Sequence, residues 1–208
     1  MASAPAVCAL TVADEPDAWR AAGFTVEGDT TRVGSIDVHL VGRTAGLGMR
    51  SWTWSDLAGN GPIDGLETDN ASPATSVPIQ HPNGSTIVDH VVVVTPQLDR
   101  TIAAFAARSV EVRRVRDTDQ YGPPFRQVFF RGGETIIELI GPTEPADEDD
   151  RPAHFYGLAF TVADLDATAS QLGDGVGSIK DAVQPGRRIA TLRHRNYDIS
   201  VPIAFMSA

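Results

Sequence analysis

The stretch IVDHVVVVTPQLDRTI, residues 87–102, joins a run of valines to a helix-like segment. The valines predict a buried β-strand, because β-branched side chains pack well on a pleated sheet. The polar turn TPQ follows, and LDRTI then has an acidic residue where the first turn of a helix favours one. The stretch therefore predicts a strand followed directly by a helix, with the ionisable side chain of His90 inside the strand.

A similar strand–turn–helix pattern occurs at three places in the chain. LTVADEPDAW begins at Leu10, VVVTPQLDRTI at Val92 and AFTVADLDATA at Ala159. The tetrapeptide TVAD occurs twice, at residues 11–14 and 161–164. Aspartates at such turns are suitable helix N-caps, because a carboxylate accepts from the free N–H groups of the first turn. The repetition indicates that the chain is built from three similar units.

Three short β-rich runs follow each helix-like segment. They are FTVEG, RVGSIDVHLVG and MRSWTWSDL in the first unit, VEVRRVRD, FRQVFFRGG and TIIELIGP in the second, and VGSIKDAV, RRIATLRH and ISVPIAFM in the third. Each unit therefore has the order βαβββ. We predict an α+β fold of tandem βαβββ modules.

Two polar segments separate the units. Residues 66–85 are rich in Pro, Ser, Thr and Asn, and residues 142–153 are rich in acidic residues and Pro. Both have too few apolar residues to pack as elements, which predicts linkers. The expected organisation is a degenerate βαβββ unit over residues 1–65 and a two-module domain over residues 86–208, with modules at 86–141 and 154–208.

The odd number of units predicts how they associate. A single unit exposes one face of a small sheet, and the two C-terminal units match best and should cover each other. The first unit then either packs on the outside of that pair or meets its copy in a second chain. Trp52 and Trp54, which share one face of a strand, are candidate anchors for such an interface. The sequence thus predicts a homodimer.

Composition limits the remaining partners. Asp and Glu number 27 against 17 Lys and Arg, for a net charge of −10, which argues against nucleic acid or an anionic membrane as the main partner. An apolar run near the start lacks a basic lead and is interrupted at Asp14, so it is neither a typical signal peptide nor a membrane span. Cys8 is the single cysteine, which excludes an internal disulfide and predicts a cytoplasmic protein.

The pattern DHVVVVTPQLDRTI…IIELIGP resembles the vicinal oxygen chelate superfamily, which includes glyoxalases, extradiol dioxygenases and bleomycin-resistance proteins. The resemblance covers the second and third units, and in the first unit it rests only on the βαβββ order and TVAD. It implies that paired modules curl into a half-open barrel around a site that commonly holds a divalent metal. The first and fourth strands of each module usually supply the ligands.

The resemblance assigns His90 to the first-strand ligand and Glu138 to the fourth-strand ligand of one module. Imidazole and carboxylate suit Zn, Fe, Mn or Ni. The matching positions of the other module are Gly157 and Ala204, which have no donor side chain. A catalytic metal generally keeps about three protein ligands, and His154 could add a third only if its strand were shifted. The implied cofactor is one divalent metal or none.

Three interpretations of His90 and Glu138 stay open. They form a metal-free hydrogen-bonded pair in a ligand pocket, where they could also act as a base and its orienting acid. Alternatively they hold a weak metal that substrate completes, or they are structural. Gln127 and Phe129 on one strand are candidate ligand-binding residues.

A second set of candidates is the arginines near residue 190. Arg188 and Arg193, or Arg187, could bind a carboxylate or phosphate if they pointed inward.

Two functional hypotheses follow. The first is a glyoxalase-like protein that binds a small organic molecule in a βαβββ cavity with an incomplete metal site. The second is a metal-dependent lyase, isomerase or dioxygenase that uses His90 and Glu138 catalytically. No Ser-His-Asp order, CxxC pair or dinucleotide fingerprint supports hydrolase or nicotinamide chemistry.

Overall fold

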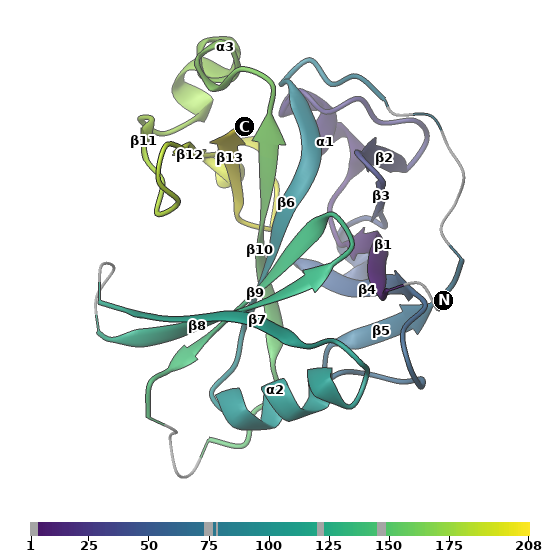
Figure 1. The fold of residues 1–208 in the computed structure, drawn as a ribbon. Helices are drawn as coiled ribbons and strands as arrows, with labels where there is room; N and C mark the ends of the chain where they lie inside the picture. The colour runs from purple at the N-terminus through teal and green to yellow at the C-terminus, as the bar shows by residue number, and fades with distance from the viewer. Residues whose placement is uncertain (1–3, 73–76, 78, 120–122, 145–148) are drawn as a thin grey trace.

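The computed structural model describes residues 4–72, 77, 79–119, 123–144 and 149–208. Within these residues the strands form a five-stranded and an eight-stranded sheet, which lie side by side in Figure 1. The helices are few and short, so the mixed α+β class predicted from the sequence is confirmed. No helix of the described part of the chain is both long and apolar enough to span a membrane.

The five-stranded sheet comes from the first unit, in the order β2-β3-β1-β4-β5. Its elements are β1 (Ala6–Val12), α1 (Pro16–Ala21), β2 (Thr30–Val33), β3 (Ile36–Leu40), the 3-10 turn η1 (Arg43–Ala45), β4 (Met49–Ser55) and β5 (Glu67–Asn70). The elements from β1 to β4 have the expected order βαβββ, but the run FTVEG at residues 24–28, predicted as a strand, does not form one. β2 and β3 instead form a hairpin within residues 30–40.

Part of the segment predicted as the first linker is instead ordered structure. Residues 67–70 form β5, which pairs parallel to β4, and the Thr68 hydroxyl accepts a 2.7 Å hydrogen bond from the indole N–H of Trp52. Further along, His81 and the backbone of Asn83 bond to the backbone after α1, with Asn83 N–H donating to the Gly23 carbonyl at 3.0 Å. Composition misses these residues because a few buried hydrogen bonds, and not apolar area, hold them in place. Residues 73–76 and 78 lie outside the described residues.

The second and third units share the eight-stranded sheet, ordered β11-β12-β13-β10-β6-β9-β8-β7. The second unit consists of β6 (Ser85–Val94), α2 (Leu98–Ala106), β7 (Val112–Thr118), β8 (Phe125–Gly132) and β9 (Thr135–Pro142). The third consists of β10 (His154–Val162), α3 (Leu165–Leu172), η2 (Gly173–Gly175), β11 (Lys180–Asp181), β12 (Arg188–Thr191), η3 (His194–Tyr197) and β13 (Ile203–Ser207). β6 and β10 pair antiparallel where the modules meet. The two end strands, β7 and β11, do not pair with each other, so the sheet is open.

The two TVAD turns behave differently. Asp164 caps α3 as expected, since its carboxylate accepts from the Ala167 N–H at 3.0 Å. Asp14 is instead fully buried and accepts from the Trp19 indole N–H at 3.2 Å and from Ser200. The same four letters therefore serve as a helix cap in one unit and as a contact between units in the other.

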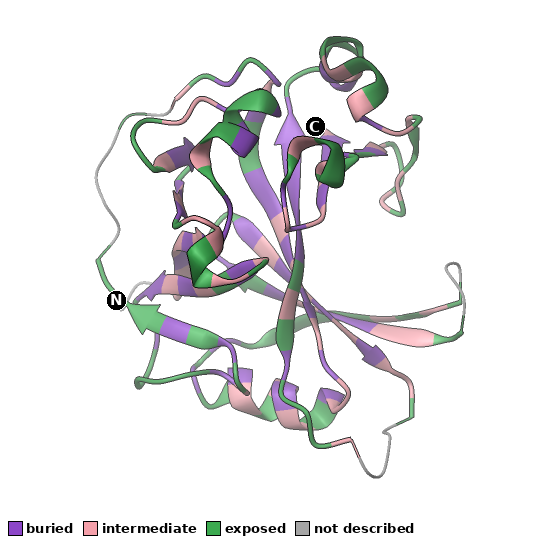
Figure 2. Cartoon of the chain, turned by 180° about the vertical axis from the view of Figure 1, so that it is seen from behind, coloured by how far each residue is buried: buried purple, intermediate pink, exposed green. Residues whose placement is uncertain are grey.

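The first unit packs on one face of the eight-stranded sheet within the same chain. The ring centroid of Trp52 lies 6.0 Å from that of Phe105 and 5.0 Å from that of Phe155. Trp54 is fully buried and approaches Gly132 of β8 so closely that an added Cβ would lie 3.0 Å from its ring. Figure 2 shows buried residues concentrated where the two sheets meet.

This packing removes the argument that predicted a homodimer. Trp52 and Trp54 bury their side chains inside the chain, so they are not free to anchor a partner. On the opposite side of the five-stranded sheet the residues in register include Thr11, His39 and Ser51. Since that face is polar, the structure leaves the first unit without an uncovered apolar face there.

Candidate functional site

The other face of the eight-stranded sheet lines a cavity of about 630 Å³. β6, β7, β8 and β9 supply one wall, and the segment between β11 and β12, with β12 and β13, supplies the other. Phe129, Ile136, Ile189 and Met206 make much of the lining apolar. Gln127 and Phe129, both candidate ligand-binding residues in the sequence, line the cavity, as do His90 and Glu138.

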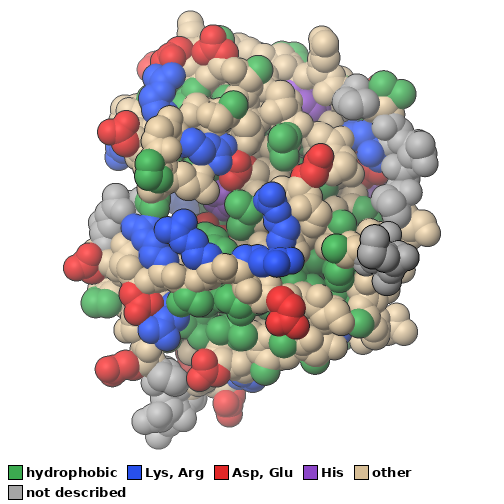
Figure 3. Space-filling view, in the orientation of Figure 1, with side chains coloured by type: hydrophobic (Ala, Val, Ile, Leu, Met, Phe, Trp, Pro, Cys, Tyr) green, Lys and Arg blue, Asp and Glu red, His purple; other side chains and the backbone are tan. Residues whose placement is uncertain are grey.

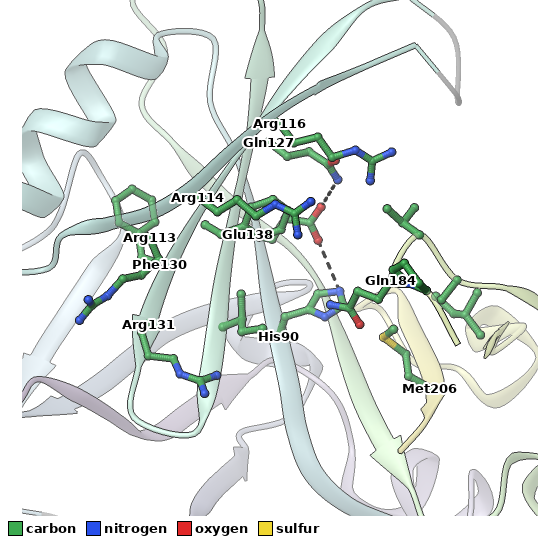
Figure 4. A pocket seen from close by; sticks show the side chains of 16 residues that line it. His90, Arg113, Arg114, Arg116, Gln127, Phe130, Arg131, Glu138, Gln184 and Met206 are labelled. Carbon is green, nitrogen blue, oxygen red and sulfur yellow. Dashed lines mark hydrogen bonds and ion pairs between the residues drawn. The ribbon is translucent and has the colours of Figure 1, made fainter. Parts of the chain in front are cut away.

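The structure brings His90 and Glu138 together. They lie on the neighbouring parallel strands β6 and β9, and His90 Nε2 is 3.4 Å from Glu138 Oε2. The Gln127 amide on β8 donates to the other carboxylate oxygen of Glu138. Figure 4 shows the three side chains converging in the cavity. Three strands thus contribute one polar centre.

Asp89 joins this centre because β6 has a bulge. Along β6, His90 pairs with Ala159 of β10 while Val88 pairs with Phe160, so Asp89 is an extra residue in the ladder. Regular alternation would place Asp89 and His90 on opposite faces, but a bulge redirects one side chain. As a result Asp89 Oδ1 lies 3.0 Å from His90 Nδ1.

The Asp89 carboxylate is held by further partners. Arg187 Nη2 donates to its Oδ2 at 2.7 Å, and the Thr161 hydroxyl donates to the same oxygen at 2.7 Å. Burial alone would raise the pKa of Asp89, but the hydrogen bonds from His90, Arg187 and Thr161 together lower it well below its ordinary value. Asp89 is therefore a carboxylate at neutral pH.

A fixed carboxylate determines how His90 is oriented. Since Asp89 can only accept, the Nδ1 of His90 must carry the proton of their hydrogen bond. The other ring nitrogen, Nε2, then faces Glu138 and the cavity. An imidazole that is oriented by a carboxylate, as His90 is by Asp89, can accept or deliver a proton at Nε2.

The donor set does not fit a divalent metal. Ala204 of β13, the position that matches Glu138, pairs with Ala159, which is itself paired with His90, so neither of these residues in the row of His90 has a donor side chain. A Cβ at Gly157 would lie 2.9 Å from the Pro202 carbonyl oxygen, which leaves little room for a ligand side chain. Across the described ranges no group of three or more His, Cys, Asp or Glu side chains is arranged to hold a metal ion.

His154 does not complete a metal site with His90. It pairs with Val94 at the far end of β10 and lines a separate small pocket with Thr95 and Pro152. Two protein donors, His90 and Glu138, therefore remain at the cavity, fewer than the three that catalytic sites usually have.

Two of the predicted arginines lie away from the cavity. The Arg188 guanidinium pairs with Asp166 of α3 at 2.6 and 3.1 Å, and neither Arg188 nor Arg193 lines the cavity. Arg187, next to Arg188 in the chain, forms an ion pair with Asp89. It therefore holds the carboxylate that orients His90 and does not itself line the cavity.

Sequence reasoning missed Asp89 as a site residue, together with the arginines of β7. The signal for Asp89 was its position next to His90, but strand alternation argued against it. For β7 the signal was the run RRVR at residues 113–116, which was used only to predict a strand.

Comparisons with known proteins agree with this architecture. A family model described as Glyoxalase/Bleomycin resistance protein/Dioxygenase superfamily matches residues 89–191. No curated protein sequence matches the chain. Many solved structures do, among them a mutant of 4-hydroxymandelate synthase from Streptomyces coelicolor, at 15% identity and a TM-score of 0.65, covering 97% of this chain and 92% of that one.

Two further solved structures illustrate how far the similarity extends. A fusion protein of a xylose isomerase-like TIM barrel and 4-hydroxyphenylpyruvate dioxygenase is 13% identical with a TM-score of 0.64, and the match covers 99% of this chain and 49% of that one. Methylmalonyl-CoA epimerase from Mycobacterium tuberculosis is 22% identical with a TM-score of 0.47, covering 60% of this chain and 89% of that one. The first of these, like the synthase, shares the fold along nearly the whole chain. Through residues 89–191 the chain belongs to the glyoxalase/bleomycin resistance protein/dioxygenase superfamily, as the DHVVVV…IIELIGP pattern indicated.

Proposed function

We propose that this protein binds a small organic molecule in the cavity of the eight-stranded sheet, without a metal held by its side chains. One observation carries the proposal: His90, Gln127 and Glu138, from three different strands, converge inside a cavity of about 630 Å³. That volume is within the range of roughly 300–1,000 Å³ typical of small-molecule sites.

Gln127 supports the polar centre of the cavity. Its amide nitrogen donates to Glu138, while its buried carbonyl oxygen has no hydrogen-bond partner among the described residues. Turning the amide over would place that oxygen against the carboxylate, so the orientation is fixed by Glu138. Gln127 therefore holds the Glu138 carboxylate in place within the cavity.

The rest of the lining favours a ligand with an apolar body. Ile136 and Phe129 lie on the same wall as Glu138, and Ile189 and Met206 face them from the other module. Burial of apolar ligand surface against these side chains supplies affinity, and the polar centre orients the ligand.

Proton transfer on the bound ligand is a second candidate function. The observation that favours it is the Asp89–His90 contact, because an oriented imidazole is the usual requirement for general acid–base catalysis. Lyase or isomerase chemistry that needs only a proton transfer would be compatible with this centre. For metal-dependent chemistry, the described residues of the cavity offer two protein donors, His90 and Glu138.

A fluorescence titration with the neutral apolar probe N-phenyl-1-naphthylamine tests the proposed function. We expect saturable binding with one site per chain, and loss of that binding in Ile136→Trp, which fills the cavity. Val41→Trp, at an exposed position outside the cavity, is the matched control and should bind normally. Equal binding by both variants, or no saturable binding by the wild-type protein, would contradict the proposal.

A homodimer and a cytoplasmic location stay predictions from the sequence. Size-exclusion chromatography with light scattering measures the first directly.

A further inference from the structure

We infer that the ligand of this cavity carries an anionic group, a carboxylate or a phosphate, which the arginines of β7 bind. This inference rests on the proposed small-molecule function and specifies the chemical class of the ligand. The binding residues are Arg114 and Arg116, with Arg113 and Arg131 at the edge of the same cavity.

Three arginines of β7 line the cavity without a side-chain partner among the described residues, and Arg50, Arg193 and Arg195 share that lack of a partner but lie outside the cavity. The guanidinium groups of Arg113, Arg114 and Arg116 make no hydrogen bond or ion pair with any residue that the structure describes. Other arginines of the chain pair with aspartates, as Arg126 does with Asp117 at 2.7 Å and Arg188 with Asp166 at 2.6 Å. In a protein with a net charge of −10, cations left unpaired beside one cavity indicate a partner that comes from outside.

Strand register places these arginines on the cavity side of the sheet. Arg114 pairs with Phe129 and Arg116 pairs with Gln127 on β8, and both partners line the cavity. The ladder shifts between Val112 and Arg114, so Arg113 is an extra residue and also lines the cavity. The bulge in β7 thus adds a charged side chain to this wall. The bulge in β6 similarly brings Asp89 to His90.

Glu138, the carboxylate that lines the same cavity as these arginines, already has other partners. Glu138 accepts from Gln127 and contacts His90, and Figure 4 draws no interaction between Glu138 and Arg114. Figure 3 shows basic side chains forming a band next to a hollow on this face. An anion placed there would relieve the mutual repulsion of the guanidinium groups and accept bidentate hydrogen bonds from them.

The opposite wall defines the other end of the ligand. Val183, Ile189 and Met206 are apolar and face the β7 arginines across the cavity. The geometry therefore fits an amphipathic molecule, with its apolar body against the third unit and its anionic group on β7. The polar centre of His90 and Glu138 lies between the two ends.

A matched pair of fluorescent probes tests the charge requirement. 8-Anilinonaphthalene-1-sulfonate and N-phenyl-1-naphthylamine share one aromatic body, and only the first carries an anionic group. We expect the sulfonate to bind the wild-type protein about tenfold more tightly, and Arg114→Gln/Arg116→Gln to remove that advantage without changing the affinity of the neutral probe.

The control variant is Arg126→Gln/Arg188→Gln, which removes the same charge from arginines that are exposed and lie outside the cavity. This variant should still bind the sulfonate more tightly than the neutral probe. The comparison separates binding by the β7 arginines from the effect of the protein's net charge. Competition by 1-naphthoate and by 1-naphthyl phosphate then shows which anion binds better, and displacement by either supports the inference.

The outcomes separate the two proposals. If the neutral probe binds and the sulfonate binds no more tightly, the anion inference fails and the proposed function stands. If the β7 variant and the control variant lose the same affinity for the sulfonate, the β7 arginines are not the site. If neither probe binds the wild-type protein, the proposed function is overturned and the inference with it.

Discussion

Asp89 and His90 are neighbours in a β-strand, yet their side chains meet on the same face with 3.0 Å between Oδ1 and Nδ1. The bulge in β6 makes this contact, and Arg187 and Thr161 hold the carboxylate in place. The relationship connects the local geometry of one strand to the orientation of the imidazole in the cavity.

Asp89→Asn should lower the free energy of unfolding by about 3 kcal/mol, because it leaves the largely buried Arg187 without its counter-charge. Chemical denaturation followed by circular dichroism measures the change. Asp166→Asn is the control, since it removes the partner of the exposed Arg188 and should cost less than about 1 kcal/mol. Similar losses in the two variants would show that the Arg187–Asp89 pair adds nothing beyond a surface ion pair.

His81 should make stability depend on pH near neutrality. Burial lowers its pKa below the ordinary 6.5, outweighing the opposite effect of the hydrogen bond to the Arg32 carbonyl. The Thr25 N–H donates to Nδ1, so the ring is held neutral. Below about pH 6.5 the unfolded chain binds a proton that the folded chain resists, and stability therefore falls with falling pH, by at most about 1.4 kcal/mol per pH unit.

The comparison of wild type with His81→Gln isolates this effect from the other histidines. Denaturation midpoints between about pH 7.5 and about pH 5.5 should fall more steeply for the wild type than for the variant. Parallel pH profiles would contradict the assignment.

Gly132→Ala should destabilise the protein by about 1–3 kcal/mol through overpacking. An added Cβ would lie 2.9 Å from a methyl of Val7 and 3.0 Å from the ring of Trp54, both in the first unit. Gly177→Ala is a matched control, because the nearest atom to its Cβ is the Thr191 carbonyl oxygen at 3.5 Å. Thermal unfolding of both variants distinguishes them, and equal midpoints would mean that the two sheets have room to separate.

Removal of divalent metal ions should not change the stability of the protein. Protein purified without a histidine tag should contain well under one divalent metal per chain, since His90 and Glu138 are two donors where about three are usual. A chelator should not lower its melting temperature, and His90→Ala should have the same metal content as the wild type. Stoichiometric metal that is lost in His90→Ala would contradict this expectation and support the metal-dependent hypothesis.

Sequence patterns were sufficient for the secondary structure of the modules. The TIIELIGP run coincides with β9 (Thr135–Pro142), and the valine run lies within β6 (Ser85–Val94). These elements were predictable because burial on a sheet imposes a strict pattern on neighbouring residues. The third unit was harder: β11 is the two residues Lys180–Asp181 within the eight-residue run VGSIKDAV that was expected as a strand.

The sequence, with the family resemblance, also predicted that His90 and Glu138 belong together. His90 and Glu138 are each in an apolar strand, and the resemblance implied that both strands face one hollow. The segment 66–85 shows the opposite case. Its polar composition predicted a linker, but Thr68, His81 and Asn83 each find hydrogen-bond partners in the first unit.

By itself the sequence determined the three βαβββ units, because alternation and repetition are local properties of the chain, and the family resemblance implied the pairing of His90 with Glu138. Only the tertiary structure decided that Asp89 joins His90, that the first unit covers the back of the sheet, and that unpaired arginines of β7 face the cavity. Each of these depends on how strands pair and on how the sheets pack, and the register of the strands is part of it. A shift of one residue in that register reverses the face of every side chain, and no local pattern records it.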